Sequence, residues 1–555
     1  MKSREMKRRS VKMIYAAIII FSLMVSIVSA AEQEDSVEAR LYSMSLEQKV
    51  GQLMIGFFRG PVLSDELAKR LETLHLGGVI LYGVSGNVEN PRQIVALTDS
   101  LQLQMRTQGD VPLFISIDQE GGRVTRLTQG VTVFPGNMAL GATGSEELAA
   151  KTAQVIAREL HSIGINMNFA PVVDVNSNPA NPVIGIRSFG SDPKLVARLG
   201  TAMLAPYRNE QVLCVAKHFP GHGDTAVDSH LGLPLAGQTR AELEETALYP
   251  FRQMIRSGVP AVMTAHVVVP ALDESGLPAT LSPTVVGLLR REIGSGLIIT
   301  DSLSMGAIDQ RWGMEEAAVQ AFLAGADLLL FGADTGHEPA EQAAIHRALL
   351  AALKSGRITE KRLDESVRRI LQSKERYGLL DAAPKAADEA ALKELASPEY
   401  LAVAEEVAKA SITLLRDKNH LLPLVQGGSI PLLWPKEYSA ALPPLLAQCP
   451  NLKPCLLPLN ATITDVPLAF RQAPLIVAGS YNLYRNRQWL ELLKALPQER
   501  MLIAAMGVPY DSDYLPGVST FLAVYGDQPV SVAALGAVLA GRQAAPGRLP
   551  VAAGK

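Results

Sequence analysis

The sequence is poor in cysteine, and its positive and negative charges nearly balance. Three cysteines in 555 residues (Cys214, Cys449 and Cys455) are too few for a disulfide scaffold or a zinc-ribbon set, although Cys449 and Cys455 could pair in an oxidising compartment. A net charge of −3 argues against a dedicated nucleic-acid-binding protein, and no phosphate-cradling P-loop is present. With 48% hydrophobic residues, wholesale disorder is excluded, and the length suits two or three domains.

The first 30 residues have the layout of a secretory signal peptide. Six basic side chains against one acidic side chain give this segment a net charge of +5, and an uncharged apolar run at Met13–Ala31 includes the small-residue cleavage site Val28-Ser29-Ala30. We predict that residues 1–30 are removed and that the remaining chain, with a net charge of −8, is exported: secreted, cell-wall-associated or periplasmic. The alternative is an uncleaved membrane anchor, because the run is just long enough to span a bilayer.

Short apolar runs alternate with helical patterns through residues 31–380, which predicts a (β/α)₈ TIM-type barrel. The strand-like runs are Val50–Phe57, Gly77–Leu81, Pro112–Ile117, Asn166–Val173, Val212–Lys217, Pro260–Ala265, Leu297–Thr300 and Asp327–Phe331. Helical patterns include Pro91–Thr107, Ser145–Ile163, Asp192–Asn209, Arg240–Arg256 and Glu315–Ala324, and cap residues occur at Ser64, Asn90, Ser145 and Asp192. An open doubly wound sheet is the alternative.

A polar linker at residues 381–398 separates the predicted barrel from a smaller C-terminal α/β domain at residues 399–555. The apolar runs of this domain are Ile412–Leu415, Ser429–Trp434, Leu475–Ala478, Met501–Ala505 and Phe521–Tyr525. They predict an α/β sandwich, a sheet with helices on both faces. The domain holds one histidine, His420, and no catalytic spacing.

Ionisable residues stand at the carboxyl ends of five predicted barrel strands, where TIM barrels place their active sites. These strand ends carry Asp118 with Glu120, Asp174, Lys217-His218, His266 and Asp301-Ser302. A single member such as Asp301 could simply cap the next helix. Five strand ends together predict a ring of polar groups around one site.

The densest polar segment is Lys217–His230, which contains three of the nine histidines and has the glycines of an irregular loop. Three interpretations compete for it. The first is a metal site, the second is a structural loop held by histidine hydrogen bonds, and the third is acid–base catalysis with Asp228 orienting His230. The metal site would use His218, His222 and His230 with Asp224 or Asp228. We favour acid–base catalysis, because the spacing matches no standard zinc motif and loop residues more often serve function than packing.

Five motifs bring these residues together: Asp118-Gln-Glu-Gly-Gly-Arg-Val-Thr-Arg126, Arg187-Ser-Phe, Lys217-His-Phe-Pro-Gly-His-Gly-Asp-Thr, Asp228-Ser-His230 and Thr300-Asp301-Ser302. This combination resembles glycoside hydrolase family 3, in the bacterial β-N-acetylhexosaminidase branch that trims N-acetylglucosamine from peptidoglycan fragments. The resemblance implies a retaining mechanism with Asp301 as the nucleophile and His230, paired with Asp228, as the general acid/base. It also implies that the terminal sugar is bound by Asp118, Arg126, Arg187, Lys217 and His218.

We therefore expect an exo-acting β-N-acetylglucosaminidase that uses neither metal nor cofactor and acts on peptidoglycan-derived or chitin-derived saccharides. Its substrate would be a small saccharide or muropeptide, with no nucleic-acid partner and membrane contact only if the leader is retained. A neutral histidine places no full negative charge beside the intermediate, so phosphorolysis is an alternative to hydrolysis. Three different functions compete with this expectation: a family 3 β-glucosidase, a metal-dependent hydrolase and a catalytically silent glycan-binding protein.

Overall fold

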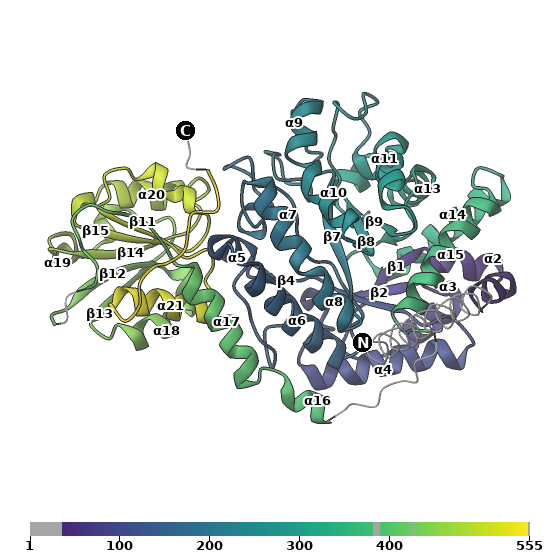
Figure 1. The fold of residues 1–555 in the computed structure, drawn as a ribbon, viewed down its shortest axis with the longest axis horizontal. Coiled ribbons are helices and arrows are strands. Elements are labelled where there is room, and N and C mark those ends of the chain that lie inside the picture. The colour runs from purple at the N-terminus through teal and green to yellow at the C-terminus, as the bar shows by residue number, and fades with distance from the viewer. Residues whose placement is uncertain (1–35, 381–388, 425–426, 553–555) are drawn as a thin grey trace, which may run out of the picture.

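The computed structural model describes residues 36–380, 389–424 and 427–552, which form two domains side by side (Figure 1). The predicted signal peptide at residues 1–30 lies outside the described residues. Within the described ranges, no helix is both long enough and apolar enough to cross a membrane.

Eight parallel strands form the predicted barrel. In sheet order they are β10 (Leu329–Leu330), β1 (Met54–Phe57), β2 (Gly78–Leu81), β3 (Phe114–Ile117), β6 (Met167–Asn168), β7 (Leu213–Phe219), β8 (Ala261–Thr264) and β9 (Leu297–Thr300). The ring closes because Ile299 of β9 bridges in parallel to Leu328, and the Thr300 amide donates to the Leu328 carbonyl at 3.0 Å. This closure confirms the barrel over the open sheet.

Helices follow the strands and surround the barrel (Figure 1). The longer ones are α3 (Asp65–Leu74), α4 (Pro91–Thr107), α6 (Glu146–Ser162), α7 (Pro193–Ala202), α11 (Pro283–Ile293), α13 (Met314–Ala324), α14 (Gln342–Lys354) and α15 (Glu360–Arg376). The predicted cap residues Ser64, Asn90, Ser145 and Asp192 each accept a hydrogen bond from a backbone amide in the first helical turn, as predicted.

Two predicted helices are each divided in two. The pattern at Asp192–Asn209 forms α7 and α8 (Leu204–Asn209), and the pattern at Arg240–Arg256 forms α9 (Arg240–Glu245) and α10 (Leu248–Arg256). Each second half contains a proline, Pro206 or Pro250. Because proline has no amide to bond the carbonyl four residues earlier, each helix is interrupted about one turn before the proline.

Several strands are shorter than their predicted apolar runs, β1 and β6 by the most residues. A capping box at Ser45 begins α2 (Leu46–Gln52), so β1 starts only at Met54 and not at Val50. Strand β6 covers just Met167–Asn168, and Pro171 farther along the run has no amide to donate to a sheet ladder.

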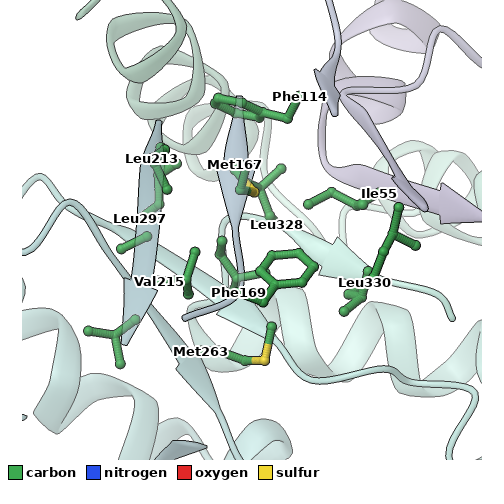
Figure 2. Packing of buried hydrophobic residues seen from close by; sticks show 14 of the residues in the cluster. Ile55, Phe114, Met167, Phe169, Leu213, Val215, Met263, Leu297, Leu328 and Leu330 are labelled. Atoms are coloured by element: carbon green, nitrogen blue, oxygen red, sulfur yellow. The ribbon is translucent and has the colours of Figure 1, made fainter. Parts of the chain in front are cut away.

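Large apolar side chains fill the barrel interior (Figure 2). The side chains labelled there are buried: Ile55, Phe114, Met167, Phe169, Leu213, Val215, Met263, Leu297, Leu328 and Leu330. They make the interior a packed core and not a channel, so the polar groups of the barrel gather at the strand ends.

The C-terminal domain is the predicted sheet with helices on both faces. Its strands, in sheet order, are β11 (Thr413–Asp417), β16 (Thr520–Ala523), β15 (Met501–Ala505), β14 (Ile476–Ser480), β12 (Ile430–Pro435) and β13 (Leu452–Leu457). Leu432 and Trp434 belong to the apolar cluster with α18 (Leu442–Gln448) and α21 (Pro529–Leu539). Leu433 joins the opposite cluster with α20 (Arg487–Lys494).

Strand β13 was not among the strands predicted from the sequence. It is an edge strand with exposed or half-buried positions after Leu452, and it contains Pro454, so it has neither the apolar run nor the composition of an inner strand. Cys449 precedes this strand and Cys455 lies within it, and both are free thiols. The Cys449 thiol donates to the Gly536 carbonyl at 3.3 Å instead of forming a disulfide.

Helix α17 (Pro398–Ser411) joins the two domains. Its Tyr400, Ala404 and Val407 pack into the barrel core, whereas Ala408 packs into the core of the C-terminal domain. Of the predicted linker, residues 381–388 lie outside the described ranges, and α16 (Glu389–Glu394) follows them. A helix shared by two cores holds the C-terminal domain against the barrel.

Candidate active site

A cavity of about 380 Å³ opens at the carboxyl end of the barrel strands. Seven of the eight residues singled out from the sequence line it: Asp118, Arg126, Arg187, Lys217, His218, His230 and Asp301. The eighth, Asp228, is bonded to His230. The polar strand ends therefore converge on one site, as the barrel prediction required.

Three cations and two carboxylates form a network on one side of this cavity. Lys217 Nζ lies 2.6 Å from Asp118 Oδ1 and 2.7 Å from Glu120 Oε1. Arg187 donates two hydrogen bonds to Glu120, at 2.7 and 2.9 Å, and Arg126 Nη2 lies 3.5 Å from Asp118 Oδ2. Burial alone would raise the pKa of Glu120, but the charges of Arg187 and Lys217 hold it far below its usual range. Glu120 is therefore ionised.

The short hairpin after β3 places Asp118, Glu120 and Arg126 together. Strand β4 (Gln119–Gly121) pairs with β5 (Val124–Thr125), and the turn between them uses two glycines at positive φ. A Cβ on Gly122 would lie 2.5 Å from the Gly136 backbone, so the turn also needs glycine for space. The hairpin returns Arg126 to within ion-pair distance of Asp118, eight residues earlier.

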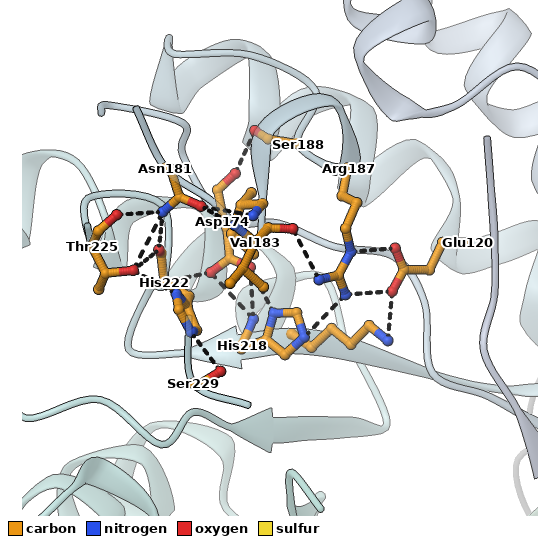
Figure 3. Close-up of polar contacts among 12 residues, drawn as sticks. Glu120, Asp174, Asn181, Val183, Arg187, Ser188, His218, His222, Thr225 and Ser229 are labelled. Atoms are coloured by element: carbon orange, nitrogen blue, oxygen red, sulfur yellow. Dashed lines mark hydrogen bonds and ion pairs between the residues drawn. The ribbon is translucent and has the colours of Figure 1, made fainter. Parts of the chain in front are cut away.

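His218 is oriented by a buried carboxylate. Asp174, which is fully buried, lies 2.7 Å from His218 Nδ1 and also accepts the His222 amide at 2.7 Å (Figure 3). Burial would raise the pKa of Asp174, but the neighbouring His218 lowers it, so Asp174 is an ionised acceptor. Nδ1 of His218 therefore carries a proton, which directs Nε2 toward Arg187 at 3.4 Å.

Asp301 emerges from β9, and the backbone beside it is fixed by its neighbours. The Ser302 carbonyl accepts a hydrogen bond from His266 Nε2 at 2.7 Å. Ser302 Oγ donates to Asp334 Oδ2 at 2.6 Å and accepts the Gly332 amide at 2.9 Å. The next helix, α12 (Gly306–Trp312), begins after Met305 without a side-chain cap, so Asp301 and Ser302 are not its capping residues.

The two carboxyl groups at this end of the cavity differ in charge state. Burial would raise the pKa of Asp301, but the charges of His218 and His266 and the Ser302 amide bring it below its ordinary value. Asp334 has a raised pKa, chiefly because it is buried and also because Asp301 is nearby. The site thus separates an ionised carboxylate suited to nucleophilic attack from a second carboxyl group that is more readily protonated.

Asp228 orients His230 from two residues away. Its Oδ1 lies 2.8 Å from His230 Nδ1 and accepts the His230 backbone amide at 3.0 Å. Burial would raise the pKa of Asp228, but these bonds from His230 lower it, so Asp228 is an anion. The pairing places a proton on Nδ1 and leaves Nε2 for proton exchange. The His230 side chain is 57% exposed, so Nε2 is accessible from the cavity.

His222 holds the base of the loop that carries His230. Its Nδ1 lies 2.8 Å from Thr225 Oγ1, and its Nε2 lies 3.0 Å from Ser229 Oγ (Figure 3). Burial lowers the pKa of His222 to about 4, so the ring is neutral near pH 7. Each of the three histidines has its own hydrogen-bond partner. In the described ranges, no group of three or more His, Cys, Asp or Glu residues is placed to hold a metal ion.

The sequence alone did not assign roles to Glu120, Asp174 and Asp334. Glu120 and Asp174 were visible at strand ends, but only the fold shows that one balances Lys217 and Arg187 and the other orients His218. Asp334 follows the eighth strand, Leu329–Leu330, as Asp301 follows the seventh. The strand-end rule points to it, because the carboxyl ends of all eight strands lie at the same face of the barrel.

The chain is similar to known glycoside hydrolases in sequence and in structure. The sequence model of the "Glycosyl hydrolase family 3 N terminal domain" matches residues 45–373. A "Beta-hexosaminidase A" of Pseudoalteromonas piscicida is 38% identical over 382 residues, covering 65% of this chain and 63% of that protein. A "Beta-N-acetylglucosaminidase/beta-glucosidase" of Cellulomonas fimi is 32% identical over 403 residues, covering 70% of this chain and 68% of that protein. The chain thus aligns with about two thirds of the length of these relatives.

A solved structure matches both domains. It is a family 3 β-N-acetylglucosaminidase from Paenibacillus sp. str. FPU-7, with a TM-score of 0.86 and 40% sequence identity. The match covers 92% of this chain and 99% of that chain. The two-domain architecture is therefore shared with that protein over nearly its whole length.

Proposed function

Because the chain belongs to glycosyl hydrolase family 3, we propose that it is an exo-acting, retaining β-N-acetylglucosaminidase that releases terminal N-acetylglucosamine by hydrolysis. One observation carries the proposal: an ionised Asp301 and the Asp228–His230 pair meet at the same cavity. Retaining hydrolysis needs an attacking carboxylate and a group that delivers and later removes a proton. The names of the β-hexosaminidase and β-N-acetylglucosaminidase relatives support this substrate class.

The reaction proceeds in two steps that return every group to its starting state. A carboxylate oxygen of Asp301 attacks the anomeric carbon while His230, protonated on both ring nitrogens, gives its Nε2 proton to the departing glycosidic oxygen. The neutral His230 then takes a proton from water, whose oxygen attacks the same carbon and frees Asp301. Asp228 stabilises the charged imidazole in the first step and keeps Nε2 as the exchanging nitrogen in both steps.

We assign the binding of the terminal sugar to the charged network and to His218. Carboxylate oxygens of Asp118 accept bonds from sugar hydroxyls, while Arg126 and Arg187 donate to hydroxyl and N-acetyl carbonyl oxygens. Arg126 also stands over the Tyr82 ring at 5.5 Å, which adds a planar apolar surface beside the polar groups. Because Lys217 and Arg187 are held by buried carboxylates, the network is rigid before substrate arrives.

We further propose that the enzyme is exported and acts in the turnover of peptidoglycan fragments. The leader pattern at residues 1–30 supports export. The net charge of −8 beyond the leader gives no general attraction for anionic wall polymer, so a small soluble fragment suits the pocket better than an intact wall.

The test is a substrate comparison with purified protein. We expect release of 4-nitrophenol from its N-acetylglucosaminide well above release from the glucoside, and free sugar rather than sugar phosphate when phosphate is added. Asp301→Asn should abolish release while circular dichroism stays unchanged. Wild-type turnover in this variant would refute the assignment of Asp301, and preference for the glucoside would refute the proposed substrate.

A further inference from the structure

A segment of the C-terminal domain reaches the rim of the active-site cavity. After β14, Tyr484 Oη donates to the Asn181 carbonyl at 3.4 Å, and Arg485 Nη2 donates to the Pro182 carbonyl at 2.9 Å. The Arg485 guanidinium also lies 5.6 Å from the centre of the Tyr484 ring. Two neighbouring residues of the second domain thus hold one loop of the barrel, and the second of them is a cation.

That barrel loop connects directly to the loop of the proposed acid/base. Asn181 Nδ2 donates to the carbonyls of His222 and Thr225 at 2.8 and 2.9 Å (Figure 3). Val183, the residue after Pro182, lines the cavity itself. Arg485 therefore stands at the rim on the side of Asp228 and His230, and its charge is one of those that lower the pKa of Asp228. In the proposed mechanism, His230 faces the leaving group, so this is the leaving-group side.

A second exposed arginine faces the same region from the barrel. Arg123 lies at the turn of the β4–β5 hairpin, and its charge acts together with that of Arg485 on Tyr438 and Tyr484 of the C-terminal domain. Asp527, half-buried beside them, also feels the charge of Arg123. In the described parts of the chain, neither Arg123 nor Arg485 forms an ion pair with a carboxylate, in contrast to exposed arginines such as Arg59, which pairs with Glu338.

We propose that Arg485, assisted by Arg123, binds a carboxylate carried by the leaving group. The inference rests on the proposed function and adds to it the side chains that select an acidic leaving group, one that carries a lactyl ether acid or an attached peptide. A guanidinium with unused donors recognises a planar carboxylate through paired hydrogen bonds, and Tyr484 restrains its position. A neutral second sugar gains nothing from either arginine.

The test compares two disaccharides that differ in one group. Both have N-acetylglucosamine at the non-reducing end; the second sugar is N-acetylmuramic acid, with a lactyl carboxylate, or neutral N-acetylglucosamine. We expect Arg485→Ala to lower the ratio of kcat/KM for the acidic over the neutral disaccharide by about fivefold, the size of a solvent-exposed charge pair. Adding Arg123→Ala should lower the ratio further, and added salt should lower it in the wild-type protein.

Arg487→Ala is the matched control, because Arg487 is an exposed arginine two residues farther along the same segment. It should leave the ratio unchanged. A third substrate, with a peptide on the lactyl group, shows which carboxylate Arg485 binds. If Arg485→Ala lowers the ratio of kcat/KM over the neutral disaccharide only for this substrate, the bound group is the peptide carboxylate. An unchanged ratio for all substrates in Arg485→Ala, with 4-nitrophenyl N-acetylglucosaminide still cleaved, would overturn this inference and leave the proposed function intact. If the wild-type protein cleaves none of these substrates, the proposed function itself is refuted.

Discussion

Replacing Glu120 with glutamine should destabilise the fold far more than the same change at Glu338. Both carboxylates accept two hydrogen bonds from one arginine, Arg187 or Arg59. The Glu120 side chain is 1% exposed, whereas that of Glu338 is 64% exposed. Removing the buried charge leaves the Arg187 guanidinium without its carboxylate partner and leaves Lys217 with Asp118 alone, which costs about 3–5 kcal/mol. The exposed pair contributes only about 0–1 kcal/mol.

Urea unfolding of the two variants at pH 7, followed by circular dichroism, measures this difference. The sign of the pH dependence gives a second readout. The pKa of Glu120 is far below its unfolded value of about 4.3, so its stabilisation is complete above that pH and is lost as the pH falls further. The wild-type protein should therefore lose stability below pH ~4.3 more steeply than Glu120→Gln does. Equal small losses in both variants at pH 7 would refute the reasoning that burial sets the strength of the pair.

Two further predictions concern the histidines. Neutral His222 has a folded pKa of about 4. The unfolded pKa of His222 is about 6.5, so the wild-type protein should lose stability as the pH falls from about 6.5 to about 4. The urea midpoint of His222→Gln should depend less on pH over this range. A pH dependence equal to that of the wild-type protein would contradict this. His230→Ala should lower kcat/KM for a disaccharide by about 10²–10⁴, the contribution of general acid–base catalysis, while His420→Ala in the C-terminal domain leaves it unchanged. A loss below tenfold in His230→Ala would remove His230 from that role.

The barrel was predictable because each of its signals is local. Eight apolar runs mark the strands, and side-chain caps such as Ser145 and Asp192 mark helix starts. Pro206 and Pro250 are also local signals, each of a helix break, although the helical periodicity continues across both positions. Strand β13 was not predictable in this way, because an exposed edge position needs no apolar side chain and its pairing with β12 is set by the rest of the sheet.

The candidate site was predictable as a set of residues but not as a set of contacts. The strand-end rule brought Asp118, Lys217 and Asp301 to one face of the barrel. It could not show that Glu120 neutralises two buried cations, since that depends on distances between strands. Nor could it place Arg485 at the rim, because the docking of the second domain is a tertiary contact between residues 303 positions apart in the chain.

The most direct test of the account is to locate the covalent glycosyl-enzyme intermediate by mass spectrometry. His230→Gln removes the group that activates water, so a substrate with a good leaving group, which needs little acid assistance, should glycosylate the enzyme faster than water releases it. The account predicts one N-acetylglucosaminyl unit on the peptide that contains Asp301, attached to that side chain. An adduct on another residue, or release of the α-anomer without any adduct, would contradict it.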